Sequence, residues 1–278
     1  MIGSADKMKV FGLTISKSVK DKDWGFTDAA LPRFSKGKTG VGVLICHGFG
    51  GSPANMRCLY DRAVAMGHTV SLPLLTGHAK TMADYAEADY TIWRKDVDEA
   101  LKQLTDAGCE RIILCGLSMG ALLMADLAER NAGLELIDGL IMMCPPIKFK
   151  TYLRVSSFFA PLIPYVLTKD EFPPGPEMEM YWGMATRKLA DIMKLSSAVL
   201  HHAASLDMPV LLLEAGEDNR VDPASFDILR ERIPNAEYVF VEGAPHGITY
   251  SPYAERACDE FTEFFKKLNI TSINKEPD

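Results

Sequence analysis

The feature that most constrains the fold of this chain is the pentapeptide G-L-S-M-G at residues 116–120, which fits the pattern G-x-S-x-G. The run just before it is apolar, as in a buried strand, and residues 121–130 are almost all strong helix formers. A strand that turns abruptly into a helix strains the residue at the turn, and small residues two positions to either side let the two segments pass closely. The sequence therefore predicts that Ser118 occupies such a turn, with its hydroxyl clear of the backbone.

Apolar runs alternate with helix-like segments along most of the chain. The run at 41–46 is apolar on both faces, as a central parallel strand covered by helices must be. Strands alternating with helices imply a mostly parallel sheet with right-handed crossovers and helices on both sides. A segment of period two, 8–15, comes earlier, and we expect it to form edge strands of this sheet. Further strands are predicted at 68–73, 111–115, 136–144, 208–215 and 236–242.

Residues 145–205 break this alternation. They hold many aliphatic and aromatic residues and a turn-rich stretch of prolines, but no strand pattern. We interpret them as a helical cap inserted into a core domain made of residues 1–144 and 206–278. Open α/β sheets bind ligands beyond the carboxyl ends of their strands, so the cap would cover the substrate. Its apolar side chains would line the cleft above the serine, and we choose four candidates: Phe158, Phe159, Met184 and Met193.

A serine hydroxyl becomes a good nucleophile when a histidine accepts its proton and an acid orients that histidine. With a serine on this kind of turn, the order along the chain is serine, acid, histidine. His246 follows a late strand in a loop of glycine and proline, whereas the other histidines precede the serine or lie in the cap. The acids at or just after the strand 208–215 are Glu214, Glu217, Asp218 and Asp222. We choose Asp218, because Asp222 precedes a proline that starts a helix and would cap that helix.

The tetrahedral intermediate of acyl transfer needs two backbone N–H donors. One would come from Met119, directly after the nucleophile, and the other from Phe49, in the glycine-rich loop after the strand 41–46. This chemistry uses neither a metal nor a cofactor, and we expect none. The six cysteines are scattered without a C-x-x-C pair, so we expect buried free thiols rather than disulfides or a metal site.

Five motifs in chain order resemble the motif series of one branch of the α/β-hydrolase family. They are L-I-C-H-G-F at 44–49, T-G-H at 76–78, G-L-S-M-G at 116–120, G-E-D at 216–218 and P-H-G at 245–247. The branch holds monoacylglycerol lipases, lysophospholipases and bacterial carboxylesterases, and the resemblance runs from about residue 40 to the C-terminus. In one place the chain departs from the family: the last residue of the usual Gly-His-Gly turn is Ala79.

The resemblance implies an α/β-hydrolase fold with a mostly parallel sheet and an inserted helical cap. It also implies a serine hydrolase of carboxylic esters, either short- to medium-chain acyl esters or monoacylglycerol-like lipids, working through an acyl-enzyme intermediate. In this series Ser118 is the nucleophile, Asp218 the acid and His246 the base. Phe49 and Met119 then supply the oxyanion donors.

Other functions are compatible with the same residues. A thioesterase or a C–C bond hydrolase can use the same triad, and a hydrolase-fold ligand receptor can keep the triad with vestigial activity. By family resemblance, a haloalkane dehalogenase would have aspartate at the position of Ser118, and a dienelactone-type enzyme would have cysteine there. Both activities are therefore disfavoured.

The formal net charge of −7 argues against a nucleic-acid partner, which calls for a basic face. No secretory leader pattern opens the sequence, and no apolar run reaches the roughly 18 residues that span a bilayer. We therefore expect a cytoplasmic enzyme of small-molecule esters without stable membrane insertion. Shallow contact between the cap and lipid stays open, as does the oligomeric state.

Overall fold

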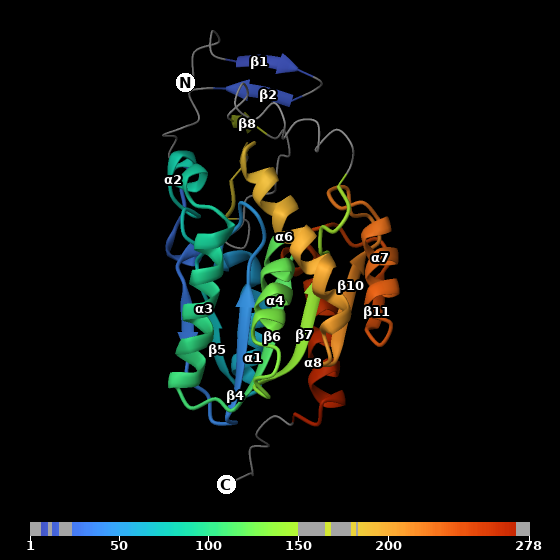
Figure 1. Cartoon of the computed structure of the whole chain (residues 1–278). Coiled ribbons are helices and arrows are strands. Elements are labelled where there is room, and N and C mark those ends of the chain that lie inside the picture. Colours follow the sequence, from blue (N-terminus) through green and yellow to red (C-terminus); the bar gives the residue numbers. More distant parts are fainter. Residues whose placement is uncertain are drawn as a thin grey trace.

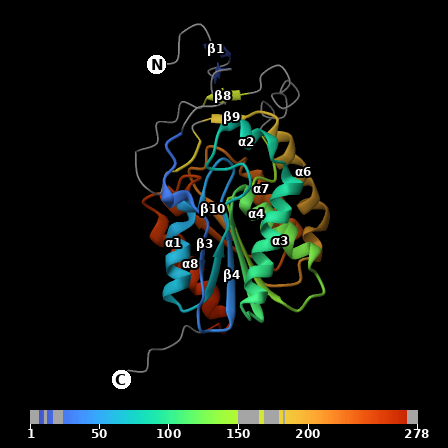
Figure 2. The same cartoon turned by 90° about the vertical axis from the view of Figure 1, so that its left-hand side faces the viewer.

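A seven-stranded sheet between two layers of helices forms the body of the molecule (Figures 1 and 2). The computed structural model describes residues 7–10, 13–16, 24–149, 165–167, 179–181 and 183–270. Every neighbouring pair of strands in this sheet is parallel except β3 and β5, which are antiparallel. The strand order is β11 (Glu237–Val241), β10 (Val210–Ala215), β7 (Ile137–Met143), β6 (Arg111–Leu117), β4 (Val41–Cys46), β5 (Thr69–Leu72) and β3 (Arg33–Ser35).

Both faces of the sheet are buried by helices, as the apolar runs predicted. On one face lie α1 (Arg57–Ala65) and α8 (Ala254–Lys267). The other face is covered by α3 (Tyr90–Asp106), α4 (Met119–Arg130), α6 (Lys188–His202) and α7 (Ala224–Arg232). Successive residues of a central strand point to opposite layers. Leu44 packs in the core on the side of α3 and α4, whereas its neighbours Val43 and Ile45 pack in the core on the side of α1 and α8. This double burial is the reason that the strands carry no polar face.

Shorter helices lie in the connections between these elements. They are η3 (Asp28–Ala30), η4 (Pro53–Met56), α2 (Met82–Glu87), η5 (Ala203–Ser205) and η6 (Ile248–Tyr250). Among the described residues, no helix is both long and apolar enough to cross a membrane.

A second, small sheet stands above the carboxyl ends of the main strands (Figure 1). It consists of β1 (Lys7–Val10), β2 (Leu13–Ser16), β8 (Tyr165–Leu167) and β9 (Gly183–Ala185), all antiparallel to their neighbours. Two expectations were wrong here. The segment 8–15 pairs with β8 rather than with the main sheet, and the inserted segment contributes two strands besides the helix α6.

Candidate active site

Ser118 lies on the predicted turn between β6 and α4. Its backbone has φ 57° and ψ −120°, and residues other than glycine rarely adopt a positive φ. Its N–H donates to the Met143 carbonyl at 2.8 Å, which ties the turn to the neighbouring strand β7. A side chain at Gly116 would overlap the backbone of Gly120, and one at Gly120 would overlap the backbone of Cys46. The two glycines are therefore required by close approach, as the pattern predicted.

Asp218 and His246 meet in the loops that follow β10 and β11. His246 Nδ1 and Asp218 Oδ2 are 2.6 Å apart, and both side chains are almost completely buried. The other carboxylate oxygen of Asp218 accepts the backbone N–H groups of Arg220 at 2.8 Å and Val221 at 2.9 Å. Asp218 is thus held in one orientation from both sides.

These contacts also fix the charge of the acid. Burial alone raises the pKa of Asp218, but the hydrogen bond and charge of His246 and the two backbone N–H groups outweigh it, so the pKa lies below its usual value. An ionised Asp218 can only accept, so the proton shared with His246 sits on Nδ1. Nε2 is then left with the lone pair that a general base needs.

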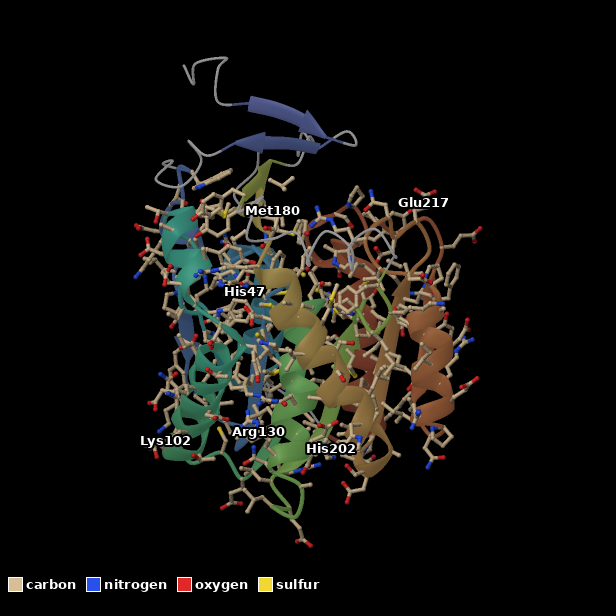
Figure 3. The ribbon with its side chains drawn as sticks, turned by 45° about the horizontal axis from the view of Figure 1, so that its top comes forward. His47, Lys102, Arg130, Met180, His202 and Glu217 are labelled. Atoms are coloured by element: carbon tan, nitrogen blue, oxygen red, sulfur yellow. The ribbon has the colours of Figure 1, made fainter. Side chains whose placement is uncertain are left out.

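Of the three acids that were not chosen, two have other hydrogen-bond partners and the third is exposed. Asp222 accepts the N–H of Ala224 at 3.1 Å, at the start of α7, which is the capping role expected of it. Glu214 accepts the hydroxyl of Tyr238 across the sheet. Glu217 is exposed and points away from the molecule (Figure 3).

Two backbone segments pass close to Ser118 where the oxyanion donors are expected. A side chain at Gly48 would lie 3.3 Å from Ser118 Cβ, so the loop after β4 runs directly against the serine. Phe49, the next residue, lines the same cavity as Ser118. Met119 is the first residue of α4, and the first N–H groups of a helix have no acceptor within the helix.

A cavity of about 360 Å³ joins these groups and extends under the cap segment. Ser118 and His246 line it, together with the loop 48–51. Most of its wall is apolar, from Leu117, Pro146, Phe149, Val166, Met180, Met184, Leu189, Ile192 and Val221. Polar groups also reach it, from Asn55, Thr186, Asn219 and Arg220. The cavity therefore suits a substrate with a long apolar part and one polar reacting group.

The four candidate cap residues have different outcomes. Met184 lines the cavity, next to Val166 in the register of β8 and β9. Met193 is half-buried on α6 and is not among the described residues of the cavity wall. Phe158 and Phe159 lie outside the described residues. Leu189 and Ile192, one turn apart on α6, line the cavity and were not chosen, although apolar residues at this spacing share one face of a helix.

One group of side chains has the composition of a metal site. Ligand atoms of Cys144, Asp218 and His246 lie within 4.8 Å of one another. Burial raises the pKa of the Cys144 thiol well above its usual range, so the sulfur is a neutral thiol and a poor metal ligand. Asp218 and His246 are bonded to each other through the atoms that a metal would need. The arrangement therefore favours the hydrogen-bonded pair over a metal. All six cysteines are free, as expected.

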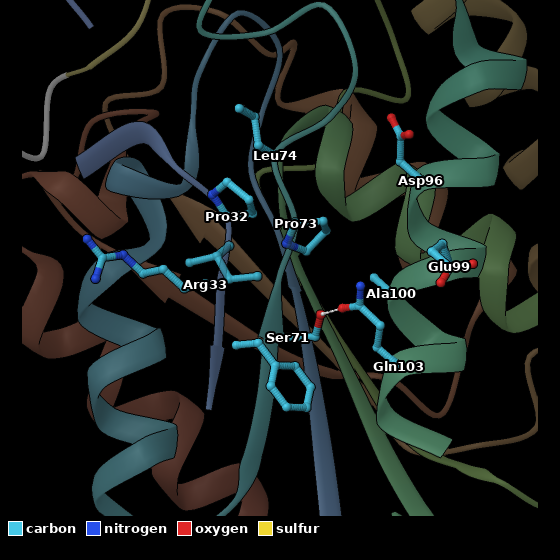
Figure 4. A pocket seen from close by; sticks show the side chains of 11 residues that line it. Pro32, Arg33, Ser71, Pro73, Leu74, Asp96, Glu99, Ala100 and Gln103 are labelled. Atoms are coloured by element: carbon cyan, nitrogen blue, oxygen red, sulfur yellow. Dashed lines mark hydrogen bonds between the residues drawn. The ribbon is translucent and has the colours of Figure 1, made fainter. Parts of the chain in front are cut away.

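A second cavity, also of about 360 Å³, lies beside the β3 edge of the sheet (Figure 4). Its wall comes from β3, β5 and α3. Ser71 Oγ donates there to Gln103 Oε1 at 3.3 Å, and Asp96 is bonded to the N–H and hydroxyl of Thr76. No histidine is among the residues of this wall, so Ser71 has no base to activate it. The cavity at Ser118, in contrast, has His246 in its wall.

Comparison with known proteins agrees with this architecture. The chain is 27% identical over 231 residues to a thermostable monoacylglycerol lipase from Bacillus sp. (strain H-257), covering 82% of this chain and 91% of that protein. It is 24% identical over 235 residues to a carboxylesterase from Bacillus subtilis, covering 82% and 93%. Among solved structures, one of the metagenome-derived lipolytic enzymes LipS and LipT superposes with a TM-score of 0.78 at 24% identity, covering 87% of this chain and 99% of that one.

The model of the alpha/beta hydrolase family matches residues 43–264. That range contains all but the first two residues of β4, the Ser118 turn and both loops that carry Asp218 and His246. The predicted fold class, a mostly parallel sheet flanked by helices, is confirmed by the strand order and by this match. The chain belongs to the alpha/beta hydrolase family.

Proposed function

We propose that this chain is a serine hydrolase that cleaves carboxylic esters through an acyl-enzyme on Ser118. One observation carries the proposal: a strained serine and a histidine line the same apolar cavity, and the histidine is hydrogen-bonded to Asp218 behind it. The names of the relatives, a monoacylglycerol lipase and a carboxylesterase, support ester hydrolysis. The substrates proposed are short- to medium-chain acyl esters or monoacylglycerol-like lipids.

The proposed reaction is an acyl transfer through Ser118. His246 Nε2 takes the proton of Ser118 Oγ as the oxygen attacks the ester carbonyl. The N–H groups of Phe49 and Met119 bind the oxyanion of the tetrahedral intermediate, and donors of this kind contribute roughly 3–4 kcal/mol each to the transition state. His246 then returns the proton to the departing alcohol, and a water activated by the same imidazole releases the acid. Asp218 keeps its charge throughout and stabilises the imidazolium.

Substrate preference would come from the apolar wall. Each methylene buried there contributes about 0.8 kcal/mol until the cavity is full, so specificity should rise over medium acyl chains and then level off. Methionine side chains adapt to several shapes, so Met180 and Met184 favour a broad preference.

A labelling experiment tests the nucleophile, and a substrate panel tests the reaction. A fluorophosphonate probe should label the native protein and fail to label Ser118→Ala, which should keep the melting temperature of the parent. p-Nitrophenyl esters from acetate to palmitate, monoacylglycerols and acyl thioesters should then be compared by kcat/KM. Labelling that survives in Ser118→Ala would reject the nucleophile, a preference for thioesters would favour the thioesterase alternative, and labelling without turnover would favour the receptor.

A further inference from the structure

The buried side chain of His78 contacts the loop that carries the expected oxyanion donor. Gly50, directly after Phe49, donates its N–H to His78 Nε2 at 3.3 Å. The ring of His78 is fully buried, and the His47 ring packs against it with centroids 4.9 Å apart. The accepting atom must be unprotonated, so the proton of the neutral imidazole is on Nδ1.

Tyr181, in the cap segment, holds the other side of the same glycine. Its N–H donates to the Gly50 carbonyl at 2.9 Å. Its hydroxyl donates to the carbonyl of Gly77 at 2.9 Å and accepts the N–H of Lys80 at 3.0 Å. The turn that contains His78 is thus fastened by the same residue that fastens Gly50. The contacts close a ring from Gly50 through His78 and its turn to Tyr181 and back to Gly50.

The backbone of Gly50 makes such fastening necessary. Its φ is +68°, a conformation open to glycine at little steric cost, and glycine has the most conformational freedom to lose. A donor N–H stabilises an oxyanion strongly only when it is fixed before the reaction. Gly48 and Gly50 flank Phe49, and Gly51 follows them. Such a loop needs external contacts to hold the Phe49 N–H, the proposed oxyanion donor, in one position.

Resting on the proposed function, we propose that His78 and Tyr181 are positioning residues that hold Gly50, and through it the Phe49 oxyanion donor. His78 supplies the acceptor for Gly50 N–H, and Tyr181 supplies the donor for its carbonyl and anchors the His78 turn. Neither residue contributes a group that reacts.

The protonation state of His78 is consistent with this role. Burial lowers the pKa of His78 well below its usual range, and the charges of His47 and Lys188 act in the same direction. A protonated ring would present an N–H to the N–H of Gly50. The neutral Nδ1–H form is the one that can hold the loop.

The experiment compares His78→Leu, which removes the acceptor, with His78→Gln, whose Oε1 can accept in place of Nε2. His68→Leu is the matched control. His68 is also a buried histidine, but it stacks on Phe265 of α8, on the other side of the sheet from His78. On an ester that the native enzyme cleaves, His78→Leu should lose about 10- to 100-fold in kcat, with KM changed by less than about threefold. His78→Gln should recover most of kcat, and His68→Leu should keep it.

Tyr181→Phe keeps the backbone N–H that binds Gly50 and removes the hydroxyl that anchors the His78 turn. It should lower kcat less than His78→Leu, and the double variant should lose less than the product of the two single effects, because the hydroxyl acts on Gly50 through His78. Equal kcat losses in folded His78→Leu and His78→Gln, or native kcat in His78→Leu, would overturn the proposal.

Nitrogen-15 NMR of the native protein labelled at histidine gives a readout that needs no activity and no variant to fold. His78 should be the Nδ1–H tautomer and should stay neutral at pH 6.5, the ordinary histidine pKa, and above it. An Nε2–H tautomer would overturn the positioning role. If the native protein cleaves no ester, the proposed function fails, whereas this measurement still decides the state of His78.

Discussion

Replacing Asp218 by asparagine should reverse the tautomer of His246, the proposed base, without altering the shape of the site. One carboxylate oxygen of Asp218 is fixed by the N–H groups of Arg220 and Val221, so in the variant the amide oxygen must take that place. The amide nitrogen then occupies the position 2.6 Å from His246 Nδ1 and donates to it. His246 would be forced to carry its proton on Nε2, where it can no longer accept the serine proton.

The expected loss in kcat is about 10⁴-fold, the loss seen for the same change in a Ser-His-Asp protease, which is equivalent to about 5.5 kcal/mol in the barrier. Steady-state hydrolysis of p-nitrophenyl butyrate measures it, with urea unfolding to show that the variant is folded. Binding of the substrate should change little, because Asp218 contacts His246 rather than the cavity wall.

Asp222 provides the control. Asp222→Ala removes the cap of α7 and should cost about 1 kcal/mol in the free energy of unfolding, with kcat near that of the native enzyme. If Asp218→Asn keeps kcat within tenfold of the native value while Asp222→Ala loses it, the acid is Asp222 and the tautomer argument fails.

Two further predictions concern stability. Ala79, which replaces the glycine of the family's turn, has φ 52°, so Ala79→Gly should raise the free energy of unfolding by up to about 1 kcal/mol, and a loss in urea unfolding would contradict this. Burial and the neighbouring Asp126 raise the pKa of Glu129 from an ordinary 4.5 to about 8, so the folded state loses stability as the pH rises between these values. Glu129→Gln should therefore unfold at higher urea than the native protein at pH 8 but not at pH 4; a difference independent of pH would reject the shift.

The main sheet could be predicted because parallel strands buried on both faces leave a continuous apolar run. The strand predicted at 41–46 is β4, and the run before Ser118 is β6, extended by two residues into the turn. The antiparallel edge strand β3 was missed, since its three residues are half-buried or exposed and too few to establish a period. A strand so short gives the sequence no pattern to detect.

The small sheet could not be predicted for a different reason. The alternation in 8–15 correctly indicates strands, but it says nothing of the partner, and the partner β8 lies about 150 residues later. The strands β8 and β9 have three residues each. An alternating pattern indicates a strand only when it extends over more residues than these segments have. The pairing of segments that are distant in the sequence is decided by the tertiary structure.

Residues expected to react and residues expected to position them differ in how far a sequence can reveal them. Acyl transfer demands a serine on a tight turn, a later acid and a later histidine, and these demands limit the choice to a few side chains. Positioning contacts carry no such demand: Gly50 meets His78 and Tyr181 through backbone atoms, across separations that no local pattern spans. Because Tyr181 belongs to the cap segment and also lines the cavity, we expect a change there to alter the rate through the Phe49 loop as well as through the cavity wall.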